Sequence, residues 1–248
     1  MKRERVDLVL VQKALASSRE KAKALILSGK ILVDHRQVDK PGTLVPIEAE
    51  IELVAERVPY VSRGGLKLEG ALQAFDVDPK GTVVMDVGAS TGGFTDCVLR
   101  RGARKVYAID VGYGQLAWEL RNDPRVVNLE RTNIRYLARE AVEEREGVDL
   151  IVVDTSFISI EKFLAHLLEF LKEDGVLIGL VKPQFEAGRE EVGRGGVVRD
   201  PLIHRKVLDQ IIAFCQELGL EVRGMIESPL LGPKGNKEFF ICLKKKTV

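Results

Sequence analysis

The sequence predicts an α/β protein with a mostly parallel sheet, preceded by a small α+β module. From Thr82 onward, short apolar runs alternate with amphipathic stretches, which is typical of parallel strands joined by helices. Glycines follow the first of these runs, as at a tight strand-to-helix turn. The first 40 residues show a different pattern, two helices and a hairpin. We therefore expect a module at residues 1–56, a linker at 57–62 and a second domain at 63–248.

Composition limits the class of protein. The 248 residues carry 38 Lys and Arg against 37 Asp and Glu, so net charge favours no particular partner. Three widely spaced cysteines predict neither a disulfide framework nor a metal site and fit a reducing cytoplasm. The longest uncharged run has nine residues, too short to cross a bilayer, and the first residues lack signal-peptide features. We expect a cytoplasmic protein without a metal.

The N-terminal module is predicted element by element. Residues 5–15 form a short apolar helix, and Ser17 or Ser18 caps a second helix that follows. Residues 31–39 form two short strands around a turn. Acidic and apolar residues alternate over 47–53, as in an edge strand, and Pro59 then interrupts pairing.

This module is basic, with ten Lys and Arg against five Asp and Glu in residues 1–40. A solvated, lysine-rich surface is the simpler interpretation. The motif SREKAKALILSGKILVDHRQV, however, resembles the S4-type RNA-binding module of a small-subunit ribosomal protein. The resemblance implies phosphate contacts from basic residues. The candidates are Arg5, Arg19, Lys23, Lys30, Arg36 and Lys40.

The second domain alternates strand and helix. We expect strands at Val83–Val87, Lys105–Asp110, Val126–Leu129, Leu150–Asp154, Val176–Val181, Glu221–Ser228 and Glu238–Lys244. The expected helices lie near 94–101, 115–122, 134–144, 160–172 and 201–218. Since the last two strands have no crossover helix between them, the final strand is predicted to be antiparallel. The layout resembles class I (Rossmann-like) S-adenosylmethionine-dependent methyltransferases, with a sheet of the seven-stranded type.

The first strand leads into the stretch VVMDVGASTGGFTD. A dinucleotide fingerprint would need glycine where Ser90 stands, and a phosphate loop would need a lysine after the glycines. The form DxGxxxGGF instead resembles the methyltransferase loop around S-adenosylmethionine; a tight turn without a ligand is the alternative. The cofactor candidates here are Asp86, Gly88, Ser90, Gly92, Gly93 and Phe94.

Further cofactor candidates follow later strands. Asp110 ends the second strand and can accept hydrogen bonds from two ribose hydroxyls, and Val111 follows it. Asn133 can donate to an adenine edge or cap a helix. Asp154 ends the fourth strand at the same rim.

Four polar residues are expected to converge at this rim. Asp154 and Lys182 end parallel strands, so they share one edge of the sheet. Glu238 begins the antiparallel strand and reaches the same edge, and Lys67 lies early on a preceding helix. At any single position, a structural ion pair is the simpler explanation.

The chain as a whole resembles the TlyA family of ribosomal RNA ribose 2′-O-methyltransferases, which have an FtsJ-like catalytic domain. SRGGLKL, DVGASTGGFTD, VVDTSFIS, LVKPQFE and NKEFF carry the resemblance. It implies a catalytic tetrad of Lys67, Asp154, Lys182 and Glu238, and cytidine targets in one or both ribosomal subunits. Family members are also called hemolysins.

Three more residues are candidates for RNA contact. Arg63 adjoins the helix of Lys67, and Arg189 lies in a glycine-rich loop at 186–200. Phe157 can stack on an extruded base, although a core phenylalanine is more frequent. Two other functions stay open: a non-catalytic RNA-binding assembly factor, and an NAD-dependent dehydrogenase.

Overall fold

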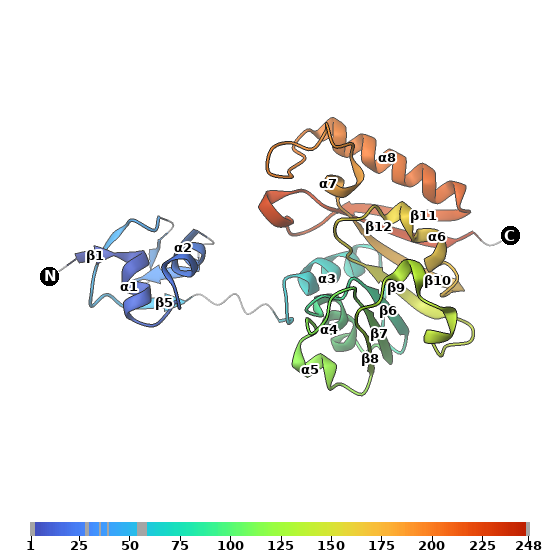
Figure 1. Ribbon diagram of the computed structural model, residues 1–248, viewed down its shortest axis with the longest axis horizontal. Coiled ribbons are helices and arrows are strands. Elements are labelled where there is room, and N and C mark those ends of the chain that lie inside the picture. Colours follow the sequence, from blue (N-terminus) through green and yellow to red (C-terminus); the bar gives the residue numbers. More distant parts are fainter. Residues whose placement is uncertain (1–2, 28–29, 35, 39, 54–58, 247–248) are drawn as a thin grey trace. The chain divides into compact units, whose positions relative to one another are not determined.

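The computed structural model describes residues 3–27, 30–34, 36–38, 40–53 and 59–246. The chain forms two compact units, Met1–Val58 and Pro59–Val248 (Figure 1). Residues 57 and 58 of the expected linker lie outside the described residues, and residues 59–62 belong to the larger unit. Within the described part of the chain, no helix is long and apolar enough to cross a membrane.

The smaller unit has two helices and two small sheets. Its elements are β1 (Arg3–Arg5), α1 (Val6–Gln12), α2 (Arg19–Leu27), β2 (Ile31–Val33), β3 (Arg36–Gln37), β4 (Leu44–Pro46) and β5 (Ile51–Leu53). Strand β2 lies between β3 and β5, so the predicted edge strand is confirmed over 51–53. The Ser18 hydroxyl accepts a hydrogen bond from the Lys21 amide at 3.3 Å, which confirms a serine cap.

A buried carboxylate fixes the two helices of this unit to each other. Asp7 in α1 is fully buried and accepts hydrogen bonds from Arg5 Nε and Arg19 Nε, each at 3.0 Å. The hydrogen bond from Arg5, followed by that from Arg19, lowers the pKa of Asp7 to about 2 against the opposing effect of burial. The apolar sides of α1 and α2 meet around it, with Val9, Leu10 and Ile26 in the core.

The larger unit is built on one seven-stranded sheet. Its strands are β6 (Val83–Val87), β7 (Lys105–Ile109), β8 (Val126–Leu129), β9 (Val148–Val153), β10 (Leu171–Val181), β11 (Leu220–Glu227) and β12 (Phe239–Lys245). Their order is β11-β12-β10-β9-β6-β7-β8, and β12 runs antiparallel to both of its neighbours. The predicted antiparallel final strand is therefore confirmed, and Glu238 stands directly before it.

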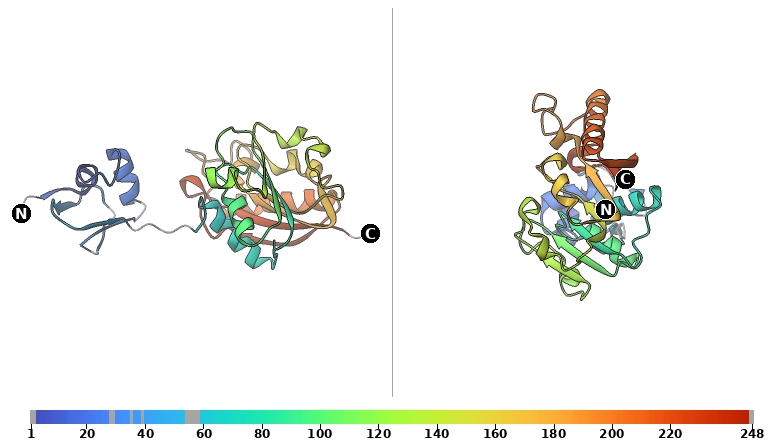
Figure 2. Two further views of the ribbon diagram at one scale, coloured as in Figure 1. Left: turned by 90° about the horizontal axis from the view of Figure 1, so that it is seen from below. Right: turned by 90° about the vertical axis from the view of Figure 1, so that its right-hand side faces the viewer.

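Helices cover both faces of this sheet (Figure 2). Helices α3 (Gly64–Ala74), α4 (Gly93–Arg100) and α5 (Trp118–Arg121) pack on one face. The other face is covered by α6 (Leu164–Leu167) and α8 (Pro201–Glu217). Side chains alternate between the two cores along β6, where Met85 faces the second group and Val84 the first.

Two predicted helices are wrong. Residues 134–144 form two 3-10 turns, Ile134–Tyr136 and Arg139–Ala141, although the buried side chains Ile134, Leu137 and Val142 have the i, i+3, i+8 spacing of a helix face. The Arg139 guanidinium also bonds to the carbonyls of Val142 and Glu144.

The expected helix at 160–172 is a 3-10 turn at Ile160–Lys162 and the single turn of α6, since β10 already begins at Leu171. The helix expected at 115–122 is shortened to α5.

We predict that Asp7→Asn destabilises the smaller unit by about 2 kcal/mol at pH 7. The folded-state pKa lies below the ordinary value, so the stabilisation is present above pH 4 and is lost as pH falls towards 2. Hydrogen exchange of the α1 and α2 amides in the full chain should become roughly 30-fold faster. The exposed Glu20→Gln on α2 serves as the control, and unchanged protection in Asp7→Asn would contradict the prediction.

Candidate active site

The loop after β6 has a backbone that few residues can adopt. Gly88 and Gly92 have φ angles of +86° and +95°, and Ser90 between them has +48°. A β-carbon on Gly88 would lie 2.5 Å from the Asp154 carbonyl oxygen, so glycine is required by both conformation and space. The loop therefore passes directly against the end of β9.

The same loop leads into α4 against the start of α3. A β-carbon on Gly93 would overlap the Ser62 hydroxyl and approach the Gly65 amide. The Val61 amide donates to Asp96 Oδ2 in α4 at 2.9 Å. These contacts hold the first turn of α3, and with it Lys67, over the carboxyl edge of the sheet.

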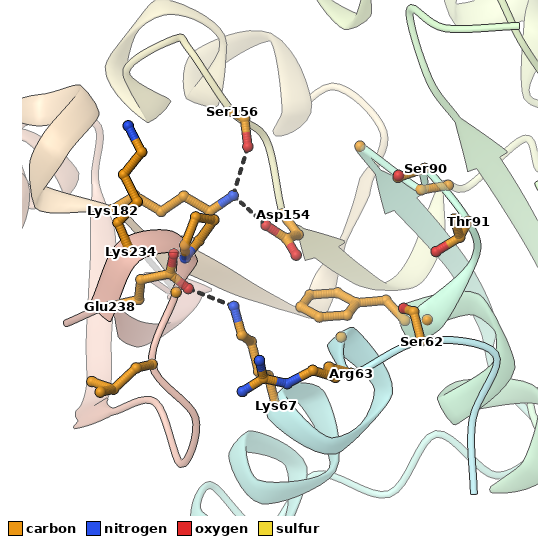
Figure 3. A pocket seen from close by; sticks show the side chains of 18 of the residues that line it. Ser62, Arg63, Lys67, Ser90, Thr91, Asp154, Ser156, Lys182, Lys234 and Glu238 are labelled. Atoms are coloured by element: carbon orange, nitrogen blue, oxygen red, sulfur yellow. Dashed lines mark hydrogen bonds and ion pairs between the residues drawn. The ribbon is translucent and has the colours of Figure 1, made fainter. Parts of the chain in front are cut away.

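Two ion pairs lie at this edge (Figure 3). Lys182 Nζ lies 2.6 Å from Asp154 Oδ1 and donates to the Ser156 hydroxyl at 2.9 Å. Lys67 Nζ donates to Glu238 Oε2 at 2.6 Å. The Glu238 side chain is fully buried and the two lysine side chains are about nine-tenths buried. The four residues that were expected to converge do so. They form two ion pairs, Lys67 with Glu238 and Lys182 with Asp154, and come from four separate segments of the chain.

The four residues line a cavity of about 630 Å³. We call it the cationic cavity, because its lining holds Arg63, Lys67, Lys182 and Lys234 against the carboxylates Asp154 and Glu238. Phe94, Gly93 and Gly88 also line this cavity, and so do residues of the 231–235 segment.

A second cavity of about 470 Å³ adjoins the first. We call it the anionic cavity, because Asp110 and Asp154 are the charged residues in its lining. Its other walls are mostly apolar, with Ile109, Val111 and Ile134 among them. Gly88, Ser90, Asp154 and Ser156 line both cavities, so the two meet at the loop after β6 and the end of β9.

The predicted cofactor residues divide between these cavities and the layer beneath them. Asp110 lines the anionic cavity and accepts hydrogen bonds from the Ser90 amide at 2.8 Å and the Gly112 amide at 2.6 Å. Val111 is largely exposed at the same cavity. Asn133 lines it too, while its side-chain oxygen caps the following turn by accepting from the Arg135 amide. The predicted cap is confirmed, and the contact with an adenine edge stays a prediction.

Asp86 and Gly92 line neither cavity. Asp86 is fully buried and accepts a hydrogen bond from the Thr95 hydroxyl at 2.6 Å. Burial, with the nearby charges of Asp154 and Asp110, raises the pKa of Asp86 to about 7. Gly92 packs against Leu116 and Leu120. Both residues therefore contact the protein interior and not the space in the cavities.

The predicted RNA residues of the larger unit lie at the surface. Arg63 is exposed at the cationic cavity. Phe157 is 89% exposed, so the core position is wrong for it, and its ring lies 5.1 Å from that of Phe185. Arg189 is exposed at a third cavity, of about 620 Å³, that Phe157 and Phe185 also line.

In the smaller unit, Lys40 is exposed and Lys23 and Lys30 are half-buried. Arg5 and Arg19 hold Asp7, yet their side chains stay 41% and 45% exposed. The Arg36 side chain lies outside what the structure describes.

Among the lining residues of the cationic cavity that the sequence analysis missed are Ser62, Ser156 and Lys234. Ser156 follows the end of β9 by three residues, so its closeness to the rim was a readable signal. Lys234 lies in the turn-rich segment before β12, where only the tertiary structure shows which way a side chain points.

Comparisons with known proteins agree with this geometry. Residues 60–245 match the FtsJ-like methyltransferase family, and residues 4–51 match the S4 domain. The chain is 49% identical over 248 residues to the 16S/23S rRNA (cytidine-2′-O)-methyltransferase TlyA of Mycobacterium tuberculosis, covering 99% of this chain and 91% of that protein.

Two further relatives span nearly the whole chain. The 23S rRNA (cytidine-2′-O)-methyltransferase TlyA of Campylobacter jejuni is 30% identical, with 93% of this chain and 95% of that protein covered. The solved structure of a "putative hemolysin" from Streptococcus thermophilus has a TM-score of 0.77 and is 43% identical in sequence. The match covers 99% of this chain and 90% of that one.

Fold and site thus define an FtsJ-like methyltransferase domain that follows an S4 domain in the sequence. Within that class, the chain belongs to the TlyA family. The dehydrogenase alternative is wrong.

We predict that Gly88→Ala lowers the free energy of unfolding by about 2–4 kcal/mol, from the positive φ and from overlap with the Asp154 carbonyl. Gly81→Ala is the matched control, since its φ is +73° and nothing lies within 4 Å of an added β-carbon. It should lose only about 1 kcal/mol. Urea unfolding followed by circular dichroism compares the two, and equal losses would show that close approach at Gly88 is unimportant.

Proposed function

We propose that this protein transfers the methyl group of S-adenosylmethionine to the 2′-hydroxyl of a cytidine in ribosomal RNA, in the cytoplasm. One observation carries the proposal: Asp154 lines both cavities and pairs with Lys182 at 2.6 Å. A donor in one cavity and a ribose in the other would meet at this carboxylate. The names of the TlyA relatives supply the RNA and the cytidine.

The anionic cavity suits S-adenosylmethionine by its donor and acceptor set. Asp110 at the end of β7 offers a carboxylate to ribose hydroxyls, and apolar side chains such as Val111 and Ile134 can enclose an adenine. Among the described residues, the lining of this cavity holds two carboxylates and no cation, although Asp154 is paired with Lys182 from the neighbouring cavity, and this charge also matches the net positive charge of the cofactor. When bound, the cofactor supplies an electrophilic methyl group on its sulfonium.

The chain's own residues hold the acceptor. Lys182 is fixed by Asp154 and Ser156, which leaves its remaining N–H free to bond a 2′-oxygen and orient its lone pair towards the methyl donor. Glu238 fixes Lys67 on the other side, so the hydroxyl lies between two positioned ammonium groups. We assign Lys182 the direct contact with the hydroxyl oxygen and the other three the positioning; the hydroxyl proton leaves to solvent as the oxygen receives the methyl group. Alignment of this kind supplies a large part of the rate.

RNA binding is assigned to the S4 domain and to the rim of the active site. In the smaller unit, Arg5 and Arg19 are held by Asp7 with part of each guanidinium at the surface, so their outward N–H groups are oriented for a phosphate before RNA arrives. Lys23, Lys30, Arg36 and Lys40 add charge, and Phe157 offers an exposed ring to a base.

The proposal is tested by methyl transfer from labelled S-adenosylmethionine to purified, unmodified ribosomal subunits, followed by mapping of the labelled nucleotide. Label on a cytidine 2′-oxygen is expected. Cofactor binding without label on any RNA would instead favour a non-catalytic assembly factor.

We predict that Lys182→Ala lowers kcat at least about 100-fold while the Kd values for cofactor and ribosomal subunits stay unchanged. Lys172→Ala is the matched control, because Lys172 forms a similar 2.6 Å pair with Asp149 at the opposite end of the same strand. It should keep full turnover. A Lys182→Ala enzyme with normal kcat would remove Lys182 from the reaction.

Asp110→Asn is expected to raise the Kd for S-adenosylmethionine about tenfold, because a neutral amide accepts weaker hydrogen bonds than a carboxylate. Titration calorimetry measures this, with Asp123→Asn outside both cavities as the control. An unchanged Kd would place the ribose elsewhere.

A further inference from the structure

Lys234 has a backbone conformation that is unfavourable for a lysine. It stands in a 3-10 turn, Pro233–Gly235, with φ of +59° and ψ of +18°. The left-handed region is unfavourable for a residue with a β-carbon, whereas glycine adopts it freely. Lys234 lines the cationic cavity, and its ammonium points away from Lys67 and Arg63, towards the Gly195 carbonyl (Figure 3).

Hydrogen bonds of the neighbouring residues fix the segment around Lys234. Asn236 is buried, and its amide donates to the Gly196 carbonyl at 2.9 Å while its oxygen accepts from the Val198 amide at 3.1 Å. The Gly232 amide donates to the Asn236 carbonyl at 2.8 Å and closes the turn. The surroundings therefore impose the position of Lys234.

The Lys234 ammonium has a weak partner. It donates to the Gly195 carbonyl at 2.7 Å and forms no ion pair with any residue that the structure describes. In contrast, Lys67 and Lys182 at the same cavity each have a carboxylate, and the nearby Lys237 pairs with Glu227 at 2.9 Å. Arg63, on the α3 side, likewise has no ion pair within the described ranges.

Summed charge then indicates what this cavity binds. Its four cations exceed its two carboxylates, which leaves two positive charges on Arg63 and Lys234. S-adenosylmethionine has a net charge of +1 and a single carboxylate, so it accounts for at most one of these two charges. A ribose within an RNA strand has a phosphodiester on each side, and each carries one negative charge.

We propose that Lys234, opposite Arg63, binds a phosphate next to the ribose being methylated, and so positions the 2′-hydroxyl at Lys182. This assignment rests on the proposed function, and it gives a binding role to a residue outside the tetrad. The weak bond to Gly195 is exchanged for a charge-assisted bond when RNA enters.

The test is the affinity for purified ribosomal subunits, measured by filter binding over a series of KCl concentrations. Lys234→Gln should raise Kd about fivefold, and the slope of log Kd against log[KCl] should fall by roughly 0.7–0.9, the loss of one phosphate contact. Lys234→Gly removes the side chain without backbone strain and should give the same slope, which excludes misfolding as the cause. Lys234→Arg should restore both values.

Lys237→Gln is the matched control in the same segment, since Lys237 is exposed but lines neither the cationic nor the anionic cavity. It should leave the slope unchanged. Wild-type slopes in both Lys234 variants would overturn the proposal, as would a selective loss of cofactor affinity. Because binding is read without turnover, failure of wild-type methyl transfer would count against the proposed function alone.

Discussion

The active site depends on two buried lysine–carboxylate pairs that join four distant segments. Lys67 reaches Glu238 across 171 residues of sequence, and Lys182 reaches Asp154 from the neighbouring strand. Breaking a buried pair by removing one partner costs roughly 3–5 kcal/mol, because an uncompensated charge is left behind. The antiparallel β12 is what brings Glu238 to the carboxyl edge, and the close contact of α3 with the loop after β6 is what brings Lys67 there. The fold and the charge pairing thus require each other.

Charge is sorted on the two sides of Asp154. One side has carboxylates and apolar walls, and the other has a surplus of cations. Such sorting separates a cationic donor from a polyanionic acceptor before either binds, since each is attracted to a different cavity. Asp154 faces both, so its single carboxylate can hold Lys182 and also lie beside the donor. Asp154, at the boundary of the two cavities, is therefore in a position to contact the donor directly and the acceptor through Lys182.

Much of this was readable from the sequence, for identifiable reasons. Apolar runs at regular intervals predicted the strands, and chain direction alone placed Asp154, Lys182 and Glu238 at one edge. The failures share a cause: they depend on contacts between distant segments. The stretch at 134–144 has a helical spacing of apolar residues, yet it forms two 3-10 turns, and the Arg139 guanidinium binds the Val142 carbonyl there. Asp86 carries the motif's first position yet is buried beneath the loop, and no local pattern reveals which way Lys234 points.

Several residues that face the cavities have a strained backbone, as do some residues elsewhere in the chain. Of the seven described residues with positive φ that are not glycine, Ser90, Phe157 and Lys234 line the two cavities or the space beside them. Phe157 has a second cost, because an aromatic ring that is 89% exposed contributes little to the core. A fold selected for stability alone would place glycine at φ of +67° and bury the ring. The unfavourable geometry persists because it presents these side chains to whatever enters, and the buried pairs beneath supply the rigidity that holds them there.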